Sequence, residues 1–350
     1  MSKKPSQYLG DQLRPFISPF RFDGSGNFHL KSHKPNEKGG LDKDKAEKIL
    51  EANRKRLSDF QEKLYAQDRW SVLLILQGMD AAGKDSAIKA IFAGVNPQGC
   101  EVHSFKQPSA NELNHDFLWR HVVALPQRGR FGIFNRSYYE ECLVPRVHRE
   151  TLAREKLPAK RVTKNIWRER FEDISAFERY LSRNGTVILK FFLNISKEEQ
   201  RKRFLDRLEE PSKNWKFSMG DVTERALWPR YMAAYQDLVR HTSTPLAPWF
   251  VVPADHKWFA RVVIGSAIVS TLETLNLRFP RTDKASLQEF KQVREALQQE
   301  GKGRGKAAKV EKGGYSAPQP RPSYPSTTSR LGHRVKKSAG LKGPAHALDS

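Results

Sequence analysis

Residues 78–84 of this 350-residue chain read Gly-Met-Asp-Ala-Ala-Gly-Lys. An apolar segment, Val-Leu-Leu-Ile-Leu at 72–76, comes directly before them, and apolar residues recur at helical spacing after them, at Ile88, Ile91 and Phe92. The order strand, glycine loop, helix is typical of a phosphate-binding loop. Glycines let backbone N–H groups turn towards a phosphate, and the start of the helix adds partial positive charge. We therefore expect phosphate to bind here, with Lys84 as the cation.

Two acidic residues distinguish this loop from the usual signature. The residue after the lysine is normally Ser or Thr, which holds magnesium, but here Asp85 follows and Ser86 comes one place later. Asp80 would repel phosphates unless it holds Mg²⁺ or orients an attacking oxygen, and we predict such a catalytic and metal-binding role. The alternative is a surface Asp in a glycine turn. The other predicted ligand-binding residues of the loop are Gly78, Met79, Ala81, Ala82, Gly83, Asp85 and Ser86.

The composition indicates a basic protein with a core of ordinary size. The formal net charge is +23, and 38% of the residues are hydrophobic. This charge indicates an anionic partner, which could be nucleic acid, an anionic membrane or a polyanionic substrate. No apolar run is long enough to cross a bilayer, and the N-terminus does not resemble a secretory signal. With Cys100 and Cys142 as the only cysteines, a reducing cytoplasm is expected.

Strand and helix patterns alternate through the central part of the chain. Residues 1–40 look irregular, and residues 41–64 form an amphipathic helical pattern. Strands are predicted at 72–76, 101–105, 130–134, 186–193 and 249–252, and further helices at 111–125, 163–181 and 259–277. Such alternation favours a three-layer α/β/α fold with a central parallel five-stranded sheet. We place this domain at 41–280, a helical extension at 281–299, and a basic tail at 300–350.

The basic tail has too few apolar residues to form a core. Lysine and arginine alternate with glycine and alanine, and prolines and serines follow. We expect a disordered segment, which could contact nucleic acid or serve only for solubility or tethering.

The third predicted strand ends in Asn-Arg-Ser-Tyr-Tyr-Glu-Glu, residues 135–141. Ligands of open α/β sheets lie beyond the carboxyl ends of the strands, so this segment should lie beside the loop. Arg136 could hold a phosphate in a bidentate manner, and Glu140 and Glu141 could bind metal or the acceptor nucleotide. The alternative is a helix N-terminus whose carboxylates suit its dipole. Asn135 stands where many phosphate-loop enzymes have a magnesium-binding Asp.

A second basic segment follows the fourth predicted strand, at about 196–222. We predict a helical lid there that closes cations over the transferred phosphate. The alternative is a solvated helix with ion pairs at i,i+4, such as Glu198–Lys202 and Glu199–Arg203. The lid cations are Arg201, Lys202, Arg203, Arg207, Lys213 and Lys216. A third basic cluster contains Lys106, Arg120, Arg128 and Arg130, together with His121, for which packing is the favoured role.

Taken together, the loop and the segments after the predicted strands resemble those of the family-2 polyphosphate kinases. The loop at 78–85 is similar to that family's Walker A loop, and 96–100, 105–109 and 134–141 are similar to its second strand and Walker B region. Residues 214–218 (Asn-Trp-Lys-Phe-Ser) resemble its lid, and 247–255 its last strand. The likeness extends over about residues 10–280, in order.

The resemblance implies a P-loop kinase-like fold and reversible, Mg²⁺-dependent transfer of phosphoryl groups between inorganic polyphosphate and nucleotides. By position, Asp80 would orient the acceptor and metal, Lys84 and Arg136 would grip the transferred phosphates, and Arg201 and Arg203 would close from the lid. Asn135 followed by Tyr-Tyr-Glu-Glu, with Tyr139, resembles the subgroup that acts on AMP and ADP to form ADP and ATP. The family also suggests dimers or tetramers.

Two other functions stay open at this point. An ATP-dependent nucleotide kinase could use the same loop, although the number of lid cations argues against it. A nucleic-acid-binding protein could use the basic surface and tail, but the sequence contains no recognisable base-reading module.

Overall fold

The computed structural model describes residues 12–216 and 218–300, and the chain divides after Arg281 into two units. Within the described part of the first unit, six strands form one sheet in the order β1-β6-β5-β2-β4-β3. Five of them run parallel and lie within one residue of the predicted strands, which confirms the parallel α/β arrangement. They are β2 (Ser71–Gln77), β3 (Cys100–Ser104), β4 (Phe131–Asn135), β5 (Thr186–Asn194) and β6 (Trp249–Pro253).

The sixth strand corrects the prediction of five. β1 (Arg21–Phe22) pairs antiparallel with β6, the last of the parallel strands on that side, and comes from the segment expected to be irregular. A strand of two residues is too short to show an alternating pattern. The prolines and glycines around it therefore indicated an irregular segment. Next to it, the buried ring of Phe20 packs edge-on against Phe259 at 5.7 Å between centroids. The residues around β1 therefore contribute to the core.

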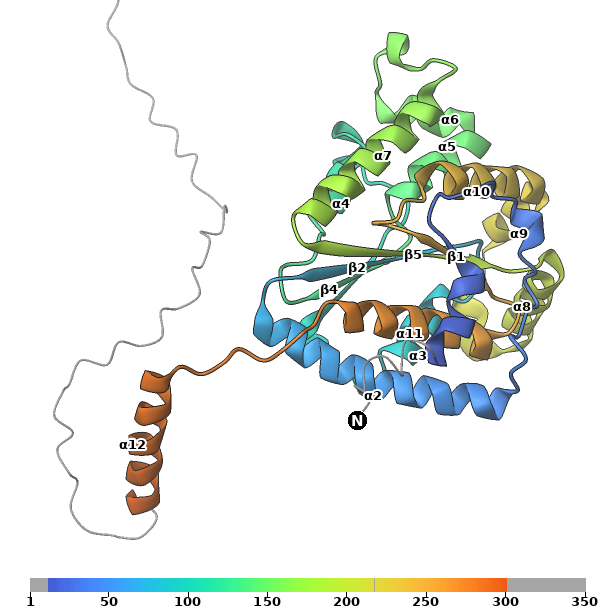
Figure 1. Cartoon of the computed structure of the whole chain (residues 1–350). Helices are drawn as coiled ribbons and strands as arrows, with labels where there is room; N and C mark the ends of the chain where they lie inside the picture. Colours follow the sequence, from blue (N-terminus) through green and yellow to red (C-terminus); the bar gives the residue numbers. More distant parts are fainter. Residues whose placement is uncertain (1–11, 217, 301–350) are drawn as a thin grey trace, which may run out of the picture. The chain divides into compact units, whose positions relative to one another are not determined.

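Helices cover both faces of the sheet (Figure 1). One face carries α2 (Lys43–Gln67), α3 (Lys84–Ile91) and α11 (Lys257–Thr274), and the other carries α7 (Ile166–Arg183) and α10 (Trp228–Thr242). α2, α7 and α11 correspond to predicted helices with shifted ends. The other α-helices that the structure describes in full in this unit are α4 (Trp119–Val122), α5 (Val144–Val147), α6 (Arg149–Leu152), α8 (Lys197–Glu209) and α9 (Met219–Ala226).

Helix α2 shows how the pattern forms the outer layer. Asp42 caps its start by accepting a hydrogen bond from the amide of Lys45 at 2.8 Å. Its buried residues recur every three or four positions, and Asn53 on this face donates to Ser266 of α11 at 3.1 Å. α11 is apolar on nearly all sides because it lies between the sheet and α2.

The single helix predicted at 111–125 is wrong. The segment contains a short 3₁₀ helix, Glu112–Asn114, and the four-residue α4. Ser109 and Glu112 form a reciprocal capping pair, and the carboxylate of Asp116 accepts from the amide of Leu118 at 2.9 Å. These polar side chains bond the backbone locally, so they compete with a continuous helix.

The second unit contains helix α12 (Lys284–Glu300), whose apolar residues Leu287, Phe290, Val293 and Leu297 are exposed. The tail expected at 300–350 lies outside the described residues from 301 onwards. Among the helices that the structure describes, none combines the length and hydrophobicity needed to span a bilayer.

A buried charged network fastens the central strand β5 to its neighbours. Lys190 of β5 is fully buried, and its Nζ donates to Glu178 Oε2 of α7 at 2.6 Å and to the Thr242 carbonyl of α10 at 2.7 Å. The hydroxyls of Tyr138 and Tyr139 both donate to Glu178 Oε1 at 2.8 Å. Burial lowers the pKa of Lys190, and the ion pair with Glu178 opposes that effect.

This network predicts an asymmetric response to mutation. Glu178→Ala should lower the free energy of unfolding by about 3–5 kcal/mol, because it leaves a buried cation without its partner. Urea unfolding followed by circular dichroism measures the change. The double variant Glu178→Leu/Lys190→Met, which removes both charges, should recover most of that stability. A single variant as stable as the wild type would contradict the role given to this pair.

Candidate active site

The glycine loop lies where the strand order reverses direction. β2 has β4 on one side and β5 on the other, and the loop leaves its carboxyl end and runs into α3. Gly78 has φ = +151°, and a Cβ there would lie 2.8 Å from the carbonyl oxygen of Leu193. Gly83 has φ = +109°, and Ala81, although not a glycine, has φ = +62°. The loop therefore needs glycine at two positions and is strained at a third.

Lys84 is buried and curls back over the loop. Its Nζ donates to the carbonyl oxygens of Gly78 at 2.7 Å and Met79 at 3.3 Å. Burial and the charge of Arg136 lower the pKa of Lys84, while the carboxylate of Asp80 opposes that shift. The ammonium is thus held at the mouth of the loop, beside the side chains that carry the opposite charge.

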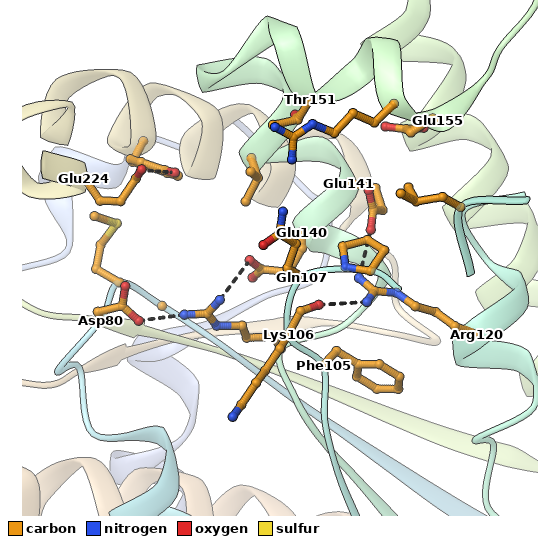
Figure 2. A pocket seen from close by; sticks show the side chains of 18 of the residues that line it. Asp80, Phe105, Lys106, Gln107, Arg120, Glu140, Glu141, Thr151, Glu155 and Glu224 are labelled. Carbon is orange, nitrogen blue, oxygen red and sulfur yellow. Dashed lines mark hydrogen bonds and ion pairs between the residues drawn. The ribbon is translucent and has the colours of Figure 1, made fainter. Parts of the chain in front are cut away.

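Asp80 and Arg136 form an ion pair at the edge of the site, with 2.6 Å between Oδ1 and Nη2 (Figure 2). Arg136 also lies 3.9 Å from Glu140 and has a left-handed backbone, φ = +64°, directly after β4. Such a conformation costs a non-glycine residue about 1–3 kcal/mol and is typical of functional sites. Burial would raise the pKa of Asp80, but the charges of Lys84 and Arg136 outweigh it and hold the pKa below its usual value.

Glu141 forms the opposite wall with Arg120. Arg120 donates to Glu141 Oε1 at 3.0 Å and to the carbonyl of Lys106 at 2.8 Å, and both charged side chains are nearly buried. Burial raises the pKa of Glu141 to about 7, although Arg120 favours its charged form. Burial also raises the pKa of Glu140. These acids therefore differ from Asp80, which stays ionised at neutral pH.

A pocket of about 320 Å³ is lined by Asp80, Arg136, Arg120 and Glu141, whereas Lys84 is not among its lining residues. Asp80 and Glu224 lie at one side of it, and Arg120, Glu141 and Glu155 at the other (Figure 2). The walls are formed by residues 78–80 after β2, 105–108 after β3, and Arg136, Glu140 and Glu141 after β4, with Leu113, Arg120, Val144, Thr151, Arg154, Glu155, Glu224, Tyr231 and Tyr235. Both the charged groups and the apolar walls thus border one cavity beside the loop.

Several predicted residues lie in or beside this pocket. Gly78, Met79, Asp80, Lys106, Arg120, Arg136, Glu140 and Glu141 line it. Close to the loop, Asn135 donates to Asp85 Oδ1, and the hydroxyl of Ser86 donates to the carbonyl of Gly83 at 2.9 Å. Ala82 is buried in the loop.

Tyr139 is a correction, because it does not line the pocket. Its ring is fully buried against Trp249, with 4.9 Å between centroids, and its hydroxyl belongs to the Lys190–Glu178 network. Its position next to Glu140 and Glu141 in the sequence suggested a ligand contact. The turn after β4 instead directs this side chain into the core.

The predicted lid cations are dispersed. Arg201 is exposed and pairs with Glu198 at 3.3 Å, whereas Arg203 is buried beneath the loop. The predicted pair Glu199–Arg203 is present at 2.8 Å. Neither arginine lines the pocket, so their predicted closure over a phosphate is not seen in this conformation.

Arg207 lies closer to the charged cluster. It pairs with Asp221 of α9 at 3.6 Å and adds to the larger effects of Lys84 and Arg136 on the pKa of Asp80. The side chains of Lys213 and Lys216 lie outside the described part of the chain.

Sequence reasoning missed the wall contributed by α9 and α10. Glu224 accepts a hydrogen bond from the hydroxyl of Tyr231 at 2.5 Å and pairs with His148 at 2.9 Å. Tyr235 and Glu155 also line the pocket. None of these belongs to a motif identified in the sequence. Glu224 comes from α9, the two tyrosines from α10, and Glu155 from the 3₁₀ helix Ala153–Glu155, so only the tertiary fold brings them together at the pocket.

The donor set at the loop fits a magnesium ion that binds together with phosphate. Mg²⁺ is commonly held by one or two carboxylates plus substrate phosphates, with water in the remaining positions. The ionised Asp80 provides one such carboxylate beside the loop. Among residues 12–216 and 218–300, no cluster of three or more His, Cys, Asp or Glu side chains could form an all-protein metal site.

Comparisons with known proteins agree with this geometry. A family model described as "Polyphosphate kinase 2 (PPK2)" matches residues 40–280. An "ADP-polyphosphate phosphotransferase" of Rhodopseudomonas palustris is 51% identical over 250 residues, 71% of this chain and 86% of the relative. An "AMP/ADP-polyphosphate phosphotransferase" of Meiothermus ruber is 43% identical over 272 residues, 77% of this chain and 98% of the relative.

A solved structure extends the agreement to the fold. The crystal structure described as polyphosphate kinase 2 from Arthrobacter aurescens TC1 matches with a TM-score of 0.73 and 39% sequence identity. The match covers 79% of this chain and 95% of that chain. The resemblance indicated by the loop and the segments around it is confirmed, and the chain belongs to the polyphosphate kinase 2 family.

Proposed function

We propose that this protein transfers phosphoryl groups reversibly from inorganic polyphosphate to AMP and ADP, forming ADP and ATP. The observation that carries the proposal is the pocket itself, in which a phosphate loop borders both a charged cluster and apolar walls. The names of the relatives from Rhodopseudomonas palustris and Meiothermus ruber support the same donor and acceptors.

The two sides of the pocket suit the two parts of a nucleotide. Its phosphates need cations, and Lys84, Arg136 and the start of α3 supply positive charge at the loop. Its base and ribose need apolar and hydrogen-bonding walls. Phe105, Leu113 and Tyr231 are among the residues that provide them. An inorganic chain of phosphates has no use for such walls, so we assign the pocket to the nucleotide.

The reaction requires two strongly repelling anions to meet. A phosphate oxygen of AMP or ADP attacks the terminal phosphorus of polyphosphate in line, and the bond to the next phosphate breaks. The attacking oxygen is already ionised, so the protein need not remove a proton from it. Its work is to position the reactants and to stabilise the charge, through Lys84, Arg136 and the backbone N–H groups of the loop.

Asp80 would contribute differently, as a carboxylate among phosphates. With its low pKa it is ionised at neutral pH and is the residue that would hold Mg²⁺. The ion supplies positive charge to the phosphate oxygens when it is bound. Arg136 keeps the Asp80 carboxylate fixed at the edge of the loop.

Other expectations remain predictions. They are the lid at 196–222, the domain limits, a cytoplasmic location, assembly into dimers or tetramers, and any contact of the basic tail with nucleic acid.

The central test is an assay without ATP. The full chain with Mg²⁺ and polyphosphate should form ADP from AMP and ATP from ADP. Chromatography of the nucleotides measures these products. Lys84→Ala should lower the rate about 100-fold or more, because it removes a cation from the transferred phosphate. Lys89→Ala is the matched control, since Lys89 is exposed on the same helix. A requirement for ATP as donor would instead favour an ATP-dependent nucleotide kinase.

Asp80→Asn separates turnover from binding. The amide keeps the size of the side chain but loses its charge, so kcat should fall while affinity for polyphosphate stays equal or rises. The rise is expected because a negative charge beside the phosphates is removed. Steady-state kinetics and calorimetric titration with tripolyphosphate measure the two effects. Weaker binding with unchanged kcat would rule out the role given to Asp80.

Glu141 predicts a pH effect on stability. Burial raises the pKa of Glu141 to about 7, above its ordinary value of 4.5, so the folded state binds the proton more tightly than the unfolded state. Ionisation of Glu141 therefore costs stability as the pH rises from about 4.5 through about 7. Glu141→Gln should lose less stability than the wild type over this interval, as measured by urea unfolding at several pH values. Parallel pH profiles for the two proteins would contradict a buried, titrating Glu141.

A further inference from the structure

The carbonyl groups of the phosphate loop are all bonded, from residue 78 to residue 83. Lys84 bonds the first two, and Gly83 accepts from the Ser86 hydroxyl and the amide of Ala87, both at 2.9 Å. The three carbonyls between them, of Asp80, Ala81 and Ala82, are bonded by side chains of α8, more than a hundred residues later in the chain.

Gln200 bonds the first of these carbonyls. Its Nε2 donates to the oxygen of Asp80 at 2.9 Å, and the side chain is buried. Its Oε1 accepts from Arg225 at 3.1 Å. The amide is therefore oriented by Arg225, with its donor directed at the loop.

Arg203 bonds the other two and ties them to the last strand. Its Nη1 donates to the carbonyls of Ala81 at 2.9 Å and Ala82 at 3.0 Å. Its Nη2 donates to the carbonyls of Ala254 at 2.6 Å and Asp255 at 2.9 Å, just after β6. One planar guanidinium thus connects two backbone segments, while Glu199 fixes its Nε at 2.8 Å.

The start of α8 is itself anchored. The side chain of Ser196 caps the helix by accepting from the amide of Glu199 at 3.1 Å. The amide of Ser196 donates to the Asp255 carboxylate at 2.7 Å. Gln200 and Arg203 therefore extend from a helix start that is fixed to the end of β6, and they can act as rigid supports.

Several N–H groups of the loop are in the opposite situation, although the amide of Ala82 donates to the carbonyl of Met79 at 3.1 Å. In the described part of the chain, the amides of Ala81, Gly83 and Lys84 have no hydrogen-bond acceptor. A peptide plane that turns its carbonyl towards α8 turns its N–H group the other way. Gln200 and Arg203 therefore determine which way the amides of Ala81 and Gly83 point, while the peptide that carries the Lys84 amide is held by Ser86 and Ala87.

We propose that Gln200 and Arg203 are positioning residues, which hold the phosphate loop in its anion-binding conformation by fixing the carbonyls of Asp80, Ala81 and Ala82. The proposal rests on the proposed function, in which this loop binds phosphate. It replaces the expected role of Arg203 as a cation that closes over the substrate. The guanidinium acts through the backbone, and its fork of donors matters as well as its charge.

Binding of inorganic tripolyphosphate with Mg²⁺ tests Gln200 by titration calorimetry. Gln200→Leu and Gln200→Glu should each weaken binding about tenfold, because both remove the donor to Asp80. Gln200→Glu keeps the oxygen that accepts from Arg225, so a role limited to that contact would be preserved in this variant. Asp206→Asn, at an exposed position of the same helix, is the control and should bind like the wild type.

Arg203→Lys and Arg203→Met test the guanidinium. Lysine keeps the charge, but one ammonium cannot bond two carbonyls of the loop and two after β6 at once. Both variants should therefore bind tripolyphosphate about tenfold more weakly and show a raised KM for polyphosphate. Near-wild-type binding by Arg203→Lys would overturn the proposal, since charge alone would then suffice.

Thermal unfolding of every variant separates positioning from general stability. If the Arg203 variants do not fold, the Gln200 variants decide, since each removes a single hydrogen bond to the loop. A wild-type protein that does not bind tripolyphosphate would refute the proposed function. A wild type that binds it, with folded Gln200 variants that bind equally well, would refute only the positioning role.

Discussion

The buried carbonyl groups of a loop that presents its N–H groups to an anion need hydrogen-bond partners of their own. In this protein side chains from two different helices, α3 and α8, provide these partners. Lys84 comes from the helix that follows the loop, and Gln200 and Arg203 come from the helix that follows β5. The sheet must place β2, β5 and β6 side by side for these groups to meet, so the strand order is part of the site.

The same arrangement explains how so many like charges can be close together. Lys84, Arg136 and Arg203 each have backbone or carboxylate oxygens as partners in this conformation. Arg203 donates to four backbone carbonyls, which fix its guanidinium in a structural position. Lys84 and Arg136 are held by fewer contacts and lie beside the pocket, which suits cations that must also meet a phosphate. The number of contacts, and not burial, distinguishes Arg203 from Lys84, since both side chains are buried.

The sequence was sufficient for features that depend on local pattern, and insufficient for those that depend on distant contacts. The five parallel strands and the loop have strong periodicity and glycine signals, and both could be predicted. β1 could not, because a strand of two residues carries no pattern. The burial of Tyr139 and the backbone contacts of Arg203 depend on which way a turn or helix faces, and the neighbouring motif residues did not indicate either. The positions of Glu224 and Tyr231 at the pocket could not be predicted, because they depend on how α9 and α10 pack in the folded chain.

The support of the loop by α8 limits how the predicted lid can move. Ser196, Gln200 and Arg203 fix the first two turns of the helix to the loop and to the end of β6. Phe204 is buried, whereas Leu205 and Leu208 are exposed. A motion of the whole helix would break the contacts that orient the loop, so closure that preserves phosphate binding has to hinge beyond Phe204. The cations that such a motion can bring to the pocket then begin at Arg207, which already lies near Asp80, and not at Arg201 or Arg203.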